Sequence, residues 1–386
     1  MRLISAVVVS ALVLGSACDE GTAQDLEASF RTENTNTPKL QGPELVINGP
    51  LGLGINGPLG LGINGPGFGL GINGPGLGLG LNGPWLQVVG ISFFNGPGLG
   101  LGLNGPGLGL GLNGITLDGS QLSVVVTKDG VSYPMSGTDL IGAEFELSLK
   151  VDVDGQQVTQ QVFLRIDNIV QSSQQDDVYL YYMTYRSGTD QAWQSYCADN
   201  TVGAIPFKGV WNQTTGAHVD DPSAFTFGCA NAAVGKCALW GYRPWATATR
   251  CPDPDKEYSD KQKAKKCTTI SLQDHHQACT RMVRADYCGN GTPATVDGTL
   301  IDVWDTLAPP IQTQFTDWPV EAEWGPDGAT CMNYMRHPEF GYPACFLDKK
   351  GKPKKFSDCG SNKKQRSELI NAFDKPGSDD DQCGDH

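Results

Sequence analysis

After its first 14 residues, this 386-residue chain has no apolar run long enough to span a bilayer as a helix, which takes about 20 residues. Basic residues are also in the minority, because 28 Lys and Arg stand against 42 Asp and Glu and leave a net charge of −14. An acidic surface does not attract phosphate backbones. The composition therefore excludes a helical transmembrane protein and a general nucleic-acid-binding protein, and we expect no nucleic-acid partner.

The N terminus has the pattern of an export signal. Arg2 precedes an apolar run over residues 3–14, which is too short to cross a hydrocarbon core of about 30 Å but is typical of a cleavable secretory signal. Small residues at 15–17 precede Cys18 and resemble a bacterial lipobox, in which the cysteine becomes the lipidated first residue. We predict a signal peptide over 1–17, a lipid on Cys18 as the contact with a membrane, and a flexible tether over 18–41. The alternative is ordinary cleavage and free secretion.

A repeat occupies residues 42–114, where seven copies of Asn-Gly-Pro are joined by short Gly/Leu runs. Alternation places every Leu of a run on one side of an extended strand. Asn-Gly tolerates the positive φ of a turn, and proline interrupts strand pairing. Two interpretations remain open, namely short stacked strands and a disordered spacer favoured by the entropy of so many glycines. The insert over residues 85–94 is the strongest strand candidate in this region.

The next part, residues 115–365, is predicted to be the folded domain, and residues 366–386 an acidic tail. Strand patterns occur over 121–127, 143–153, 157–166 and 177–185, with a hairpin turn at Asp154-Gly155. Helical spacing indicates one helix from about Cys229 to Trp240 and a second after Ser271, with Asp274 as its capping-box partner. The fold class is therefore α+β, with a small antiparallel sheet followed by a disulfide-rich helical part.

Twelve cysteines in an exported chain indicate disulfides. Removal or lipidation of Cys18 leaves eleven, and Cys383 in the acidic tail is the candidate for the unpaired one. The ten predicted disulfide cysteines are Cys197, Cys229, Cys237, Cys251, Cys267, Cys279, Cys288, Cys331, Cys345 and Cys359.

The pairing of these ten cysteines follows in part from distance. Cysteines eight or nine residues apart on a helix are about 12 Å apart or more, beyond the reach of about 7 Å that a disulfide allows. Two antiparallel helices joined by Cys229–Cys288 and Cys237–Cys279 satisfy this limit. Local pairs Cys251–Cys267 and Cys345–Cys359 follow as the next hypothesis, with Cys197–Cys331 as a long-range pair. Each local pair encloses a lysine-rich stretch, at residues 261–266 and 349–355, which we interpret as a solvated, crosslinked loop.

The run from His276 to Gly291 contains Ala285-Asp286-Tyr287-Cys288, which resembles the signature of the ADYC-domain proteins, a family of bacterial exported proteins and lipoproteins. Further resemblance to this family lies at residues 225–229, 236–245, 297–304 and 321–325, within a region that covers about 140–345. The resemblance implies an exported location. It implies no particular chemistry.

One possible catalytic constellation combines His275, His276 and Cys279 with Asp286. A thiol nucleophile needs a neighbouring base, and one helix offers both. A bridged cysteine is no nucleophile, however, so we expect no catalytic residue here, and we expect His276 to pack on a helix face and His275 to face solvent. Arg281 and Arg284 are expected to form ordinary ion pairs on the same helix. The cysteine and histidine spacing fits no standard zinc site, so neither a metal nor a cofactor is expected.

A second candidate is the aromatic cluster Trp240, Tyr242, Arg243 and Trp245. Such a cluster can form a sugar platform or a peptide groove, with Arg243 stacked as a cation. The alternative, which we favour, is that large aromatics fill the core of a disulfide-rich domain, as do Trp304, Trp318 and Trp324.

The sequence as a whole predicts an exported, disulfide-stabilised protein, lipid-anchored in the cell envelope at the outer membrane or surface. We expect it to be a binding or structural module with a protein or glycan ligand, and not an enzyme. The competing interpretation is a secreted hydrolase that uses the His275/His276/Cys279 helix.

Overall fold

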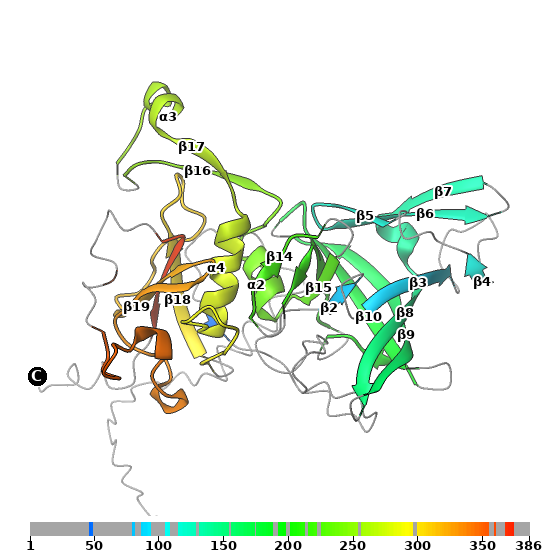
Figure 1. Cartoon of the computed structure of the whole chain (residues 1–386). Coiled ribbons are helices and arrows are strands. Elements are labelled where there is room, and N and C mark those ends of the chain that lie inside the picture. Colours follow the sequence, from blue (N-terminus) through cyan, green and yellow to red (C-terminus); the bar gives the residue numbers. More distant parts are fainter. Residues whose placement is uncertain are drawn as a thin grey trace, which may run out of the picture. The chain divides into compact units, whose positions relative to one another are not determined.

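The computed structural model describes residues 46–48, 79–81, 86–93, 105–108, 115–128, 131–153, 156–173, 175–187, 192–197, 201–212, 215–221, 225–253, 256–295, 299–354, 359 and 367–373. Most elements are strands, arranged in several antiparallel sheets (Figure 1). The predicted signal peptide, Cys18, tether and Cys383 lie outside the described residues, as does most of the repeat. Among the described helices, none is both long and apolar enough to cross a membrane.

The largest sheet has nine strands in the order β2-β15-β12-β10-β9-β8-β3-β4, with β11 added beside β10. Its strands are β2 (Leu79–Leu81), β3 (Leu86–Phe93), β4 (Gly105–Leu108), β8 (Ala143–Val153), β9 (Gln156–Gln171), β10 (Tyr179–Ser187), β11 (Gln194–Ser195), β12 (Ala204–Lys208) and β15 (Phe225–Cys229). The predicted strand over 143–153 is found with both its bounds. The strands predicted over 85–94, 157–166 and 177–185 overlap β3, β9 and β10.

Alternation of side chains gives this sheet one core face. On β9, Leu164 and Ile166 are buried, whereas Arg165 between these two residues is only half-buried. On β10, Met183 and Tyr185 are buried as well. The core face packs against a three-stranded sheet of β5 (Ile115–Asp118), β6 (Gln121–Lys128) and β7 (Val131–Ser136), and against the 3₁₀ helix η3 (Gly137–Leu140). The strand predicted over 121–127 is β6.

A second sheet of five strands has the order β1-β18-β21-β19-β20. Its members are β1 (Val46–Asn48), β18 (Thr299–Asp305), β21 (Leu369–Phe373), β19 (Val320–Gly325) and β20 (Gly328–Met332). Helix α4 (Gln273–Arg284) packs against β19, β20 and β21, and α2 (Ala233–Leu239) packs against α4. Strand β21 lies within the segment predicted to be the tail. That boundary is wrong, because β21 pairs with both β18 and β19 and contributes buried side chains.

The remaining elements are short. Two two-stranded ribbons are formed by β13 (Val210–Trp211) with β14 (His218–Val219), and by β16 (Thr247–Arg250) with β17 (Thr268–Ser271). Helix α3 (Asp260–Lys266) lies between β16 and β17, where the sequence suggested a loop. The 3₁₀ helices η4 (Pro338–Phe340) and η5 (Ala344–Phe346) follow β20.

Both predicted helices exist with shorter bounds. Cys229 is the last residue of β15, so α2 begins four residues later than predicted. The predicted capping box of Ser271 and Asp274 is wrong, because the N-cap of α4 is Leu272 and makes no side-chain cap. The Ser271 hydroxyl instead accepts a hydrogen bond from the Gln273 amide at 3.1 Å.

Five disulfides join the ten cysteines named above. Cys237–Cys279 and Cys251–Cys267 are found as predicted. The other three bonds are Cys197–Cys229, Cys288–Cys345 and Cys331–Cys359. The predicted pairs Cys229–Cys288, Cys345–Cys359 and Cys197–Cys331 are therefore wrong, chiefly because Cys229 belongs to a strand and cannot face Cys288 across two helices.

Candidate functional site

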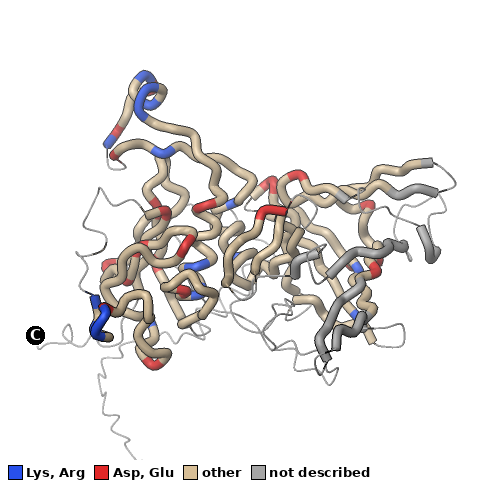
Figure 2. Tube along the Cα trace, viewed as in Figure 1, with Lys and Arg blue, Asp and Glu red and all other residues tan. Residues whose placement is uncertain are grey.

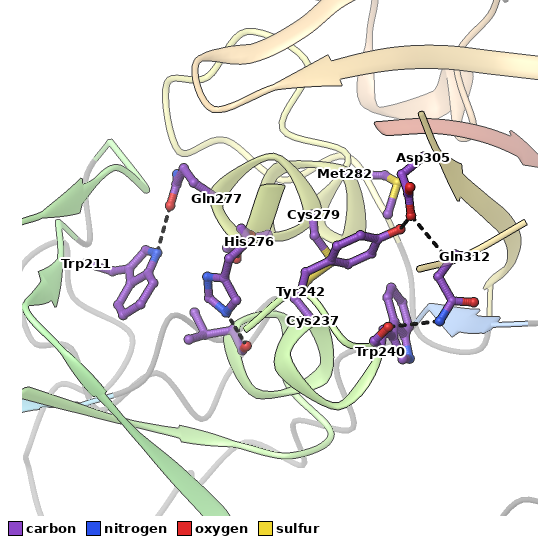
Figure 3. Close-up of a disulfide and its surroundings, with 12 residues drawn as sticks. Trp211, Cys237, Trp240, Tyr242, His276, Gln277, Cys279, Met282, Asp305 and Gln312 are labelled. Carbon is purple, nitrogen blue, oxygen red and sulfur yellow. Dashed lines mark hydrogen bonds between the residues drawn. A yellow bond between two sulfur atoms is a disulfide. The ribbon is translucent and has the colours of Figure 1, made fainter. Parts of the chain in front are cut away.

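The proposed catalytic cysteine, Cys279, is fully buried and bonded to Cys237, so α4 is crosslinked to α2 (Figure 3). His276 is buried beside it, and its Nε2 lies 2.9 Å from the Val234 carbonyl oxygen. Rings of Phe207 and Trp211 surround this imidazole, with centroids at 5.2 and 5.6 Å. Burial lowers the pKa of His276 to about 3, which keeps it neutral.

His275 does not face solvent as expected, because it is also fully buried. Tyr242 stacks on its ring at 6.3 Å, and an Arg250 Nη lies 3.4 Å from its Nε2. Burial, and secondarily the charge of Arg250, lower the pKa of His275 to about 3. Both imidazoles are therefore buried in the packed interior between α4 and its neighbours.

The tetrapeptide Ala285-Asp286-Tyr287-Cys288 ends α4 and begins a tight turn. Ala285 has a left-handed backbone with φ +50°, and its amide donates to the Met282 carbonyl at 3.0 Å. Asp286 accepts hydrogen bonds from the Asn290 and Gly291 amides at 3.0 and 2.9 Å and forms an ion pair with Arg281. The ion pair expected for Arg281 is therefore present, and it is a buried one, because both charged side chains are at most 2% exposed.

Tyr287 fixes the turn to the five-stranded sheet, and Cys288 fixes it to η5 through a disulfide. The Tyr287 hydroxyl donates to Glu321 at 2.8 Å and accepts the Arg336 amide at 2.9 Å, while its ring stacks on Trp324 at 5.3 Å. Cys288 forms a disulfide with Cys345, which lies in η5.

Beneath Tyr287 lies a fully buried ion pair between Glu321 and Arg336, whose side chains are 0% exposed. The Arg336 Nε donates to Glu321 at 3.0 Å, and the Asn371 amide donates to the same carboxylate at 2.8 Å. Trp324 Nε1 in turn donates to Asn371 at 2.7 Å. Every polar partner here is another buried group, so the tetrapeptide is a structural element that joins α4 to the sheet.

The aromatic cluster is also mostly structural. Tyr242 is fully buried, and its hydroxyl donates a hydrogen bond to Asp305 at 2.9 Å (Figure 3). Trp240 is 8% exposed, and its backbone carbonyl accepts a hydrogen bond from the Gln312 side chain at 2.8 Å. Asp177 forms an ion pair with Arg243 and accepts a hydrogen bond from Trp245 Nε1 at 2.8 Å. The four residues are thus divided between two environments and do not form one platform.

A concave surface is found elsewhere, on the nine-stranded sheet, with a volume of about 420 Å³. We call it the Trp193 depression. Its floor is the sheet face opposite the core, where Glu144 on β8 pairs directly with Arg165 on β9. Its lining residues are Ile141, Gly142, Glu144, Arg165, Ile166, Asp167, Arg186 and Trp193.

Two guanidinium groups contact the indole of Trp193, Arg165 at 4.3 Å and Arg186 at 4.4 Å from the ring. Each cation also has a carboxylate partner, since Arg165 contacts Asp167 and Arg186 lies 3.7 Å from Glu144. Burial raises the pKa of Glu144, and the two arginines oppose this shift. The depression therefore presents hydrogen-bond donors, acceptors and an aromatic ring with balanced charge.

Sequence reasoning missed this surface, although part of its signal is visible. Alternation places Glu144 opposite in direction to Phe145, and Arg165 opposite to Leu164, so both point away from the core. Trp193 comes from the segment after β10, and only the folded chain brings it onto the same face. Within the described ranges, no three His, Cys, Asp or Glu side chains converge in a way that could hold a metal ion.

A family model described as the ADYC domain matches residues 137–338, and this confirms the resemblance seen in the sequence. The match covers β8 to β20 and includes both the tetrapeptide and the Trp193 depression. No curated protein and no solved structure matches the chain.

Proposed function

The chain belongs to the ADYC domain family, and we propose that it is an exported, non-catalytic module that binds a ligand in the Trp193 depression. Cys18 would carry the lipid that holds it in the cell envelope, and the repeat would serve as a spacer. The Trp193 depression is the observation that carries the proposal, because it joins an aromatic ring to four charged groups on a rigid sheet.

Export is supported by the disulfides. The described residues contain five disulfides, and such bonds form and persist in oxidising compartments and are rare in the cytosol. The hydrolase alternative is weakened by the same bonds. It needs a thiolate at Cys279, and that sulfur is bonded to Cys237.

The ligand class follows from the charge balance. Arg165 and Arg186 offer several N–H donors, while Glu144 and Asp167 offer acceptors, and the formal charges of the four groups sum to zero. A strongly anionic or cationic ligand would have to displace an existing partner. A neutral polyhydroxyl ligand can use donors, acceptors and the indole together, so we propose a neutral glycan.

Ligand binding can be tested with an array of neutral oligosaccharides. We expect Trp193→Ala and Arg165→Gln to weaken binding about tenfold or more, as loss of a central aromatic or arginine contact does. Trp318→Ala is the matched control, because Trp318 is half-buried and does not line the depression. Failure of every oligosaccharide to bind the unmodified chain, or full binding by Trp193→Ala, would refute the assignment.

The redox state and the anchor need separate tests. Alkylation of the native protein without reductant should leave Cys279 unlabelled, and reduction should expose ten further thiols. Labelling of Cys279 before reduction would restore the hydrolase alternative. Palmitate incorporation that disappears in Cys18→Ser would support the lipid anchor, whereas equal incorporation in both chains would exclude it.

A further inference from the structure

A lysine-rich arm precedes α4 and extends from the N-terminal end of that helix (Figure 1). It consists of the β16–β17 ribbon, the disulfide Cys251–Cys267 at the end of that ribbon, and helix α3 beyond the disulfide. Lys261, Lys263, Lys265 and Lys266 lie on α3, and Figure 2 shows their charge gathered at the tip of the arm. We infer that this arm docks onto an anionic phospholipid surface.

The arm is held in one conformation without a core of its own. All seven residues of α3 are exposed, so the helix buries nothing. An isolated helix of this length is marginal in water, and here it is supported by a capping box between Ser259 and Gln262 and by the disulfide. At the base, the Ala308 amide donates to the Thr249 carbonyl at 2.8 Å. The side chains of α3 therefore face solvent and are accessible to a partner.

The lysines are available for an external partner. In the part of the chain that the structure describes, no carboxylate lies within ion-pair distance of Lys261, Lys263, Lys265 or Lys266. Four lysines and Asp260 give α3 a net charge of 4 − 1 = +3. This stands against a net charge of −14 for the whole chain. The whole segment closed by Cys251–Cys267 also contains Lys256, Asp253, Asp255 and Glu257, so its net charge is 5 − 4 = +1. The positive excess is therefore concentrated on α3 itself.

The acidic body does not cancel this local charge at physiological ionic strength. The four-residue strand β16 is about 13 Å long and the seven-residue α3 about 10 Å. Both lengths exceed the screening length of about 8 Å in 0.15 M salt. Charges on the rest of the chain are therefore largely screened at α3. An approaching surface responds to the four lysines together with the acidic residues of the same disulfide-closed segment.

The side chains of α3 fit a lipid surface better than other anionic partners. At 100° per residue, Lys261 and Lys265 fall on one side of the helix and Lys263 and Lys266 on the other. The only apolar residue among them is Ala264, so α3 offers neither an aromatic to stack on a nucleic-acid base nor an anchor for a protein groove. A membrane requires charge and no particular shape, and each lysine that reaches it strengthens binding about fivefold.

This inference goes beyond the glycan proposal, and it does not depend on the lipid predicted to be attached to Cys18. A single acyl chain gives only marginal membrane binding, and a basic patch supplies the second contact that stable anchoring needs. The arm would then also orient the domain on the membrane to which Cys18 attaches it.

The test is co-sedimentation of the mature chain carrying Cys18→Ser, which cannot be lipidated, with phosphatidylcholine vesicles that contain or lack phosphatidylglycerol. In the arm variant, Lys261, Lys263, Lys265 and Lys266 are changed to Gln. In the control variant, the exposed lysines Lys349, Lys350, Lys352 and Lys354 are changed to Gln, which removes the same charge from a loop without a helix. Ser259 and Gln262 remain in both, so the capping box is kept.

We expect binding only to vesicles with phosphatidylglycerol. The arm variant should bind about 25-fold less or weaker still, since at least two lysines lose contact, and the control should change by less than about fivefold. Equal losses in the two variants would overturn the inference, as would no preference for phosphatidylglycerol. Binding to duplex DNA or to an acidic polysaccharide in place of vesicles would also overturn it. Circular dichroism and a thiol count show whether each variant is folded.

Discussion

Removal of the Tyr287 hydroxyl tests whether the tetrapeptide is a structural element. Tyr287→Phe keeps the ring, and with it the stacking on Trp324 at 5.3 Å. It removes the hydrogen bond to Glu321 at 2.8 Å and the acceptor for the Arg336 amide at 2.9 Å. The substitution therefore changes two buried hydrogen bonds and little else.

The expected cost can be worked from these two contacts. A hydrogen bond to a charged group contributes about 1.5–3 kcal/mol, and a buried donor left without a partner costs about 1–3 kcal/mol. Glu321 keeps its contacts with Arg336 and Asn371, which offsets part of the loss. We expect Tyr287→Phe to lower the free energy of unfolding by about 2–4 kcal/mol.

Urea unfolding under non-reducing conditions measures this change as a shift in the midpoint at constant slope. The control is Tyr334→Phe, whose hydroxyl donates to the Pro319 carbonyl at the surface and, at 3.1 Å, to the partly buried Phe373 carbonyl. Water can replace the partner at the surface, so the cost should stay below about 1 kcal/mol. Burial raises the pKa of Tyr287 well above its usual range, so the difference should not depend on pH between 5 and 8. Equal midpoints for the two variants would refute the structural role.

Three further predictions use the same assay. Asp286→Asn leaves Arg281, 2% exposed, without its carboxylate and should cost about 3–5 kcal/mol. The pKa of His276 falls to about 3 on folding, so the unfolded chain binds the extra proton between about pH 3 and 6.5, and stability falls as the pH drops through that range. His276→Phe should make the loss between pH 6 and 5 smaller by about 1 kcal/mol, and an unchanged slope would contradict the neutral, buried imidazole. Double replacement of Cys237 and Cys279 by Ala opens a 42-residue loop and should cost about 4 kcal/mol, and a cost below about 1 kcal/mol would argue against a structural bond.

The sequence predicted those elements whose pattern is local. The strand over 143–153 has clear alternation and was placed correctly, as was the disulfide between Cys251 and Cys267, which closes a short loop. Strand β15 was missed because all five of its residues are buried, so it lacks alternation and can be taken for the start of a helix. That error moved Cys229 into α2 and produced the wrong partner for Cys288.

Features that depend on distant segments could not be predicted in this way. Strand β21 follows a lysine-rich loop and precedes an acidic segment, so composition assigned it to the tail, but its pairing with β18 and β19 puts it inside a sheet. Trp193 reaches Arg165 and Arg186 only after β9 and β10 have paired. Periodicity indicates which face of a strand is polar, and it does not indicate that the face is hollow.

The position of the tetrapeptide limits what family membership implies. Asp286 closes the turn after α4 and Tyr287 binds the buried Glu321–Arg336 pair, so these residues specify how a helix meets a sheet. The Trp193 depression lies on the other large sheet and shares none of these contacts. The contacts made by the tetrapeptide therefore do not involve the residues that line the depression. Membership of the ADYC family accordingly supports the architecture of this protein, whereas the ligand that we propose rests on Glu144, Arg165, Arg186 and Trp193 themselves.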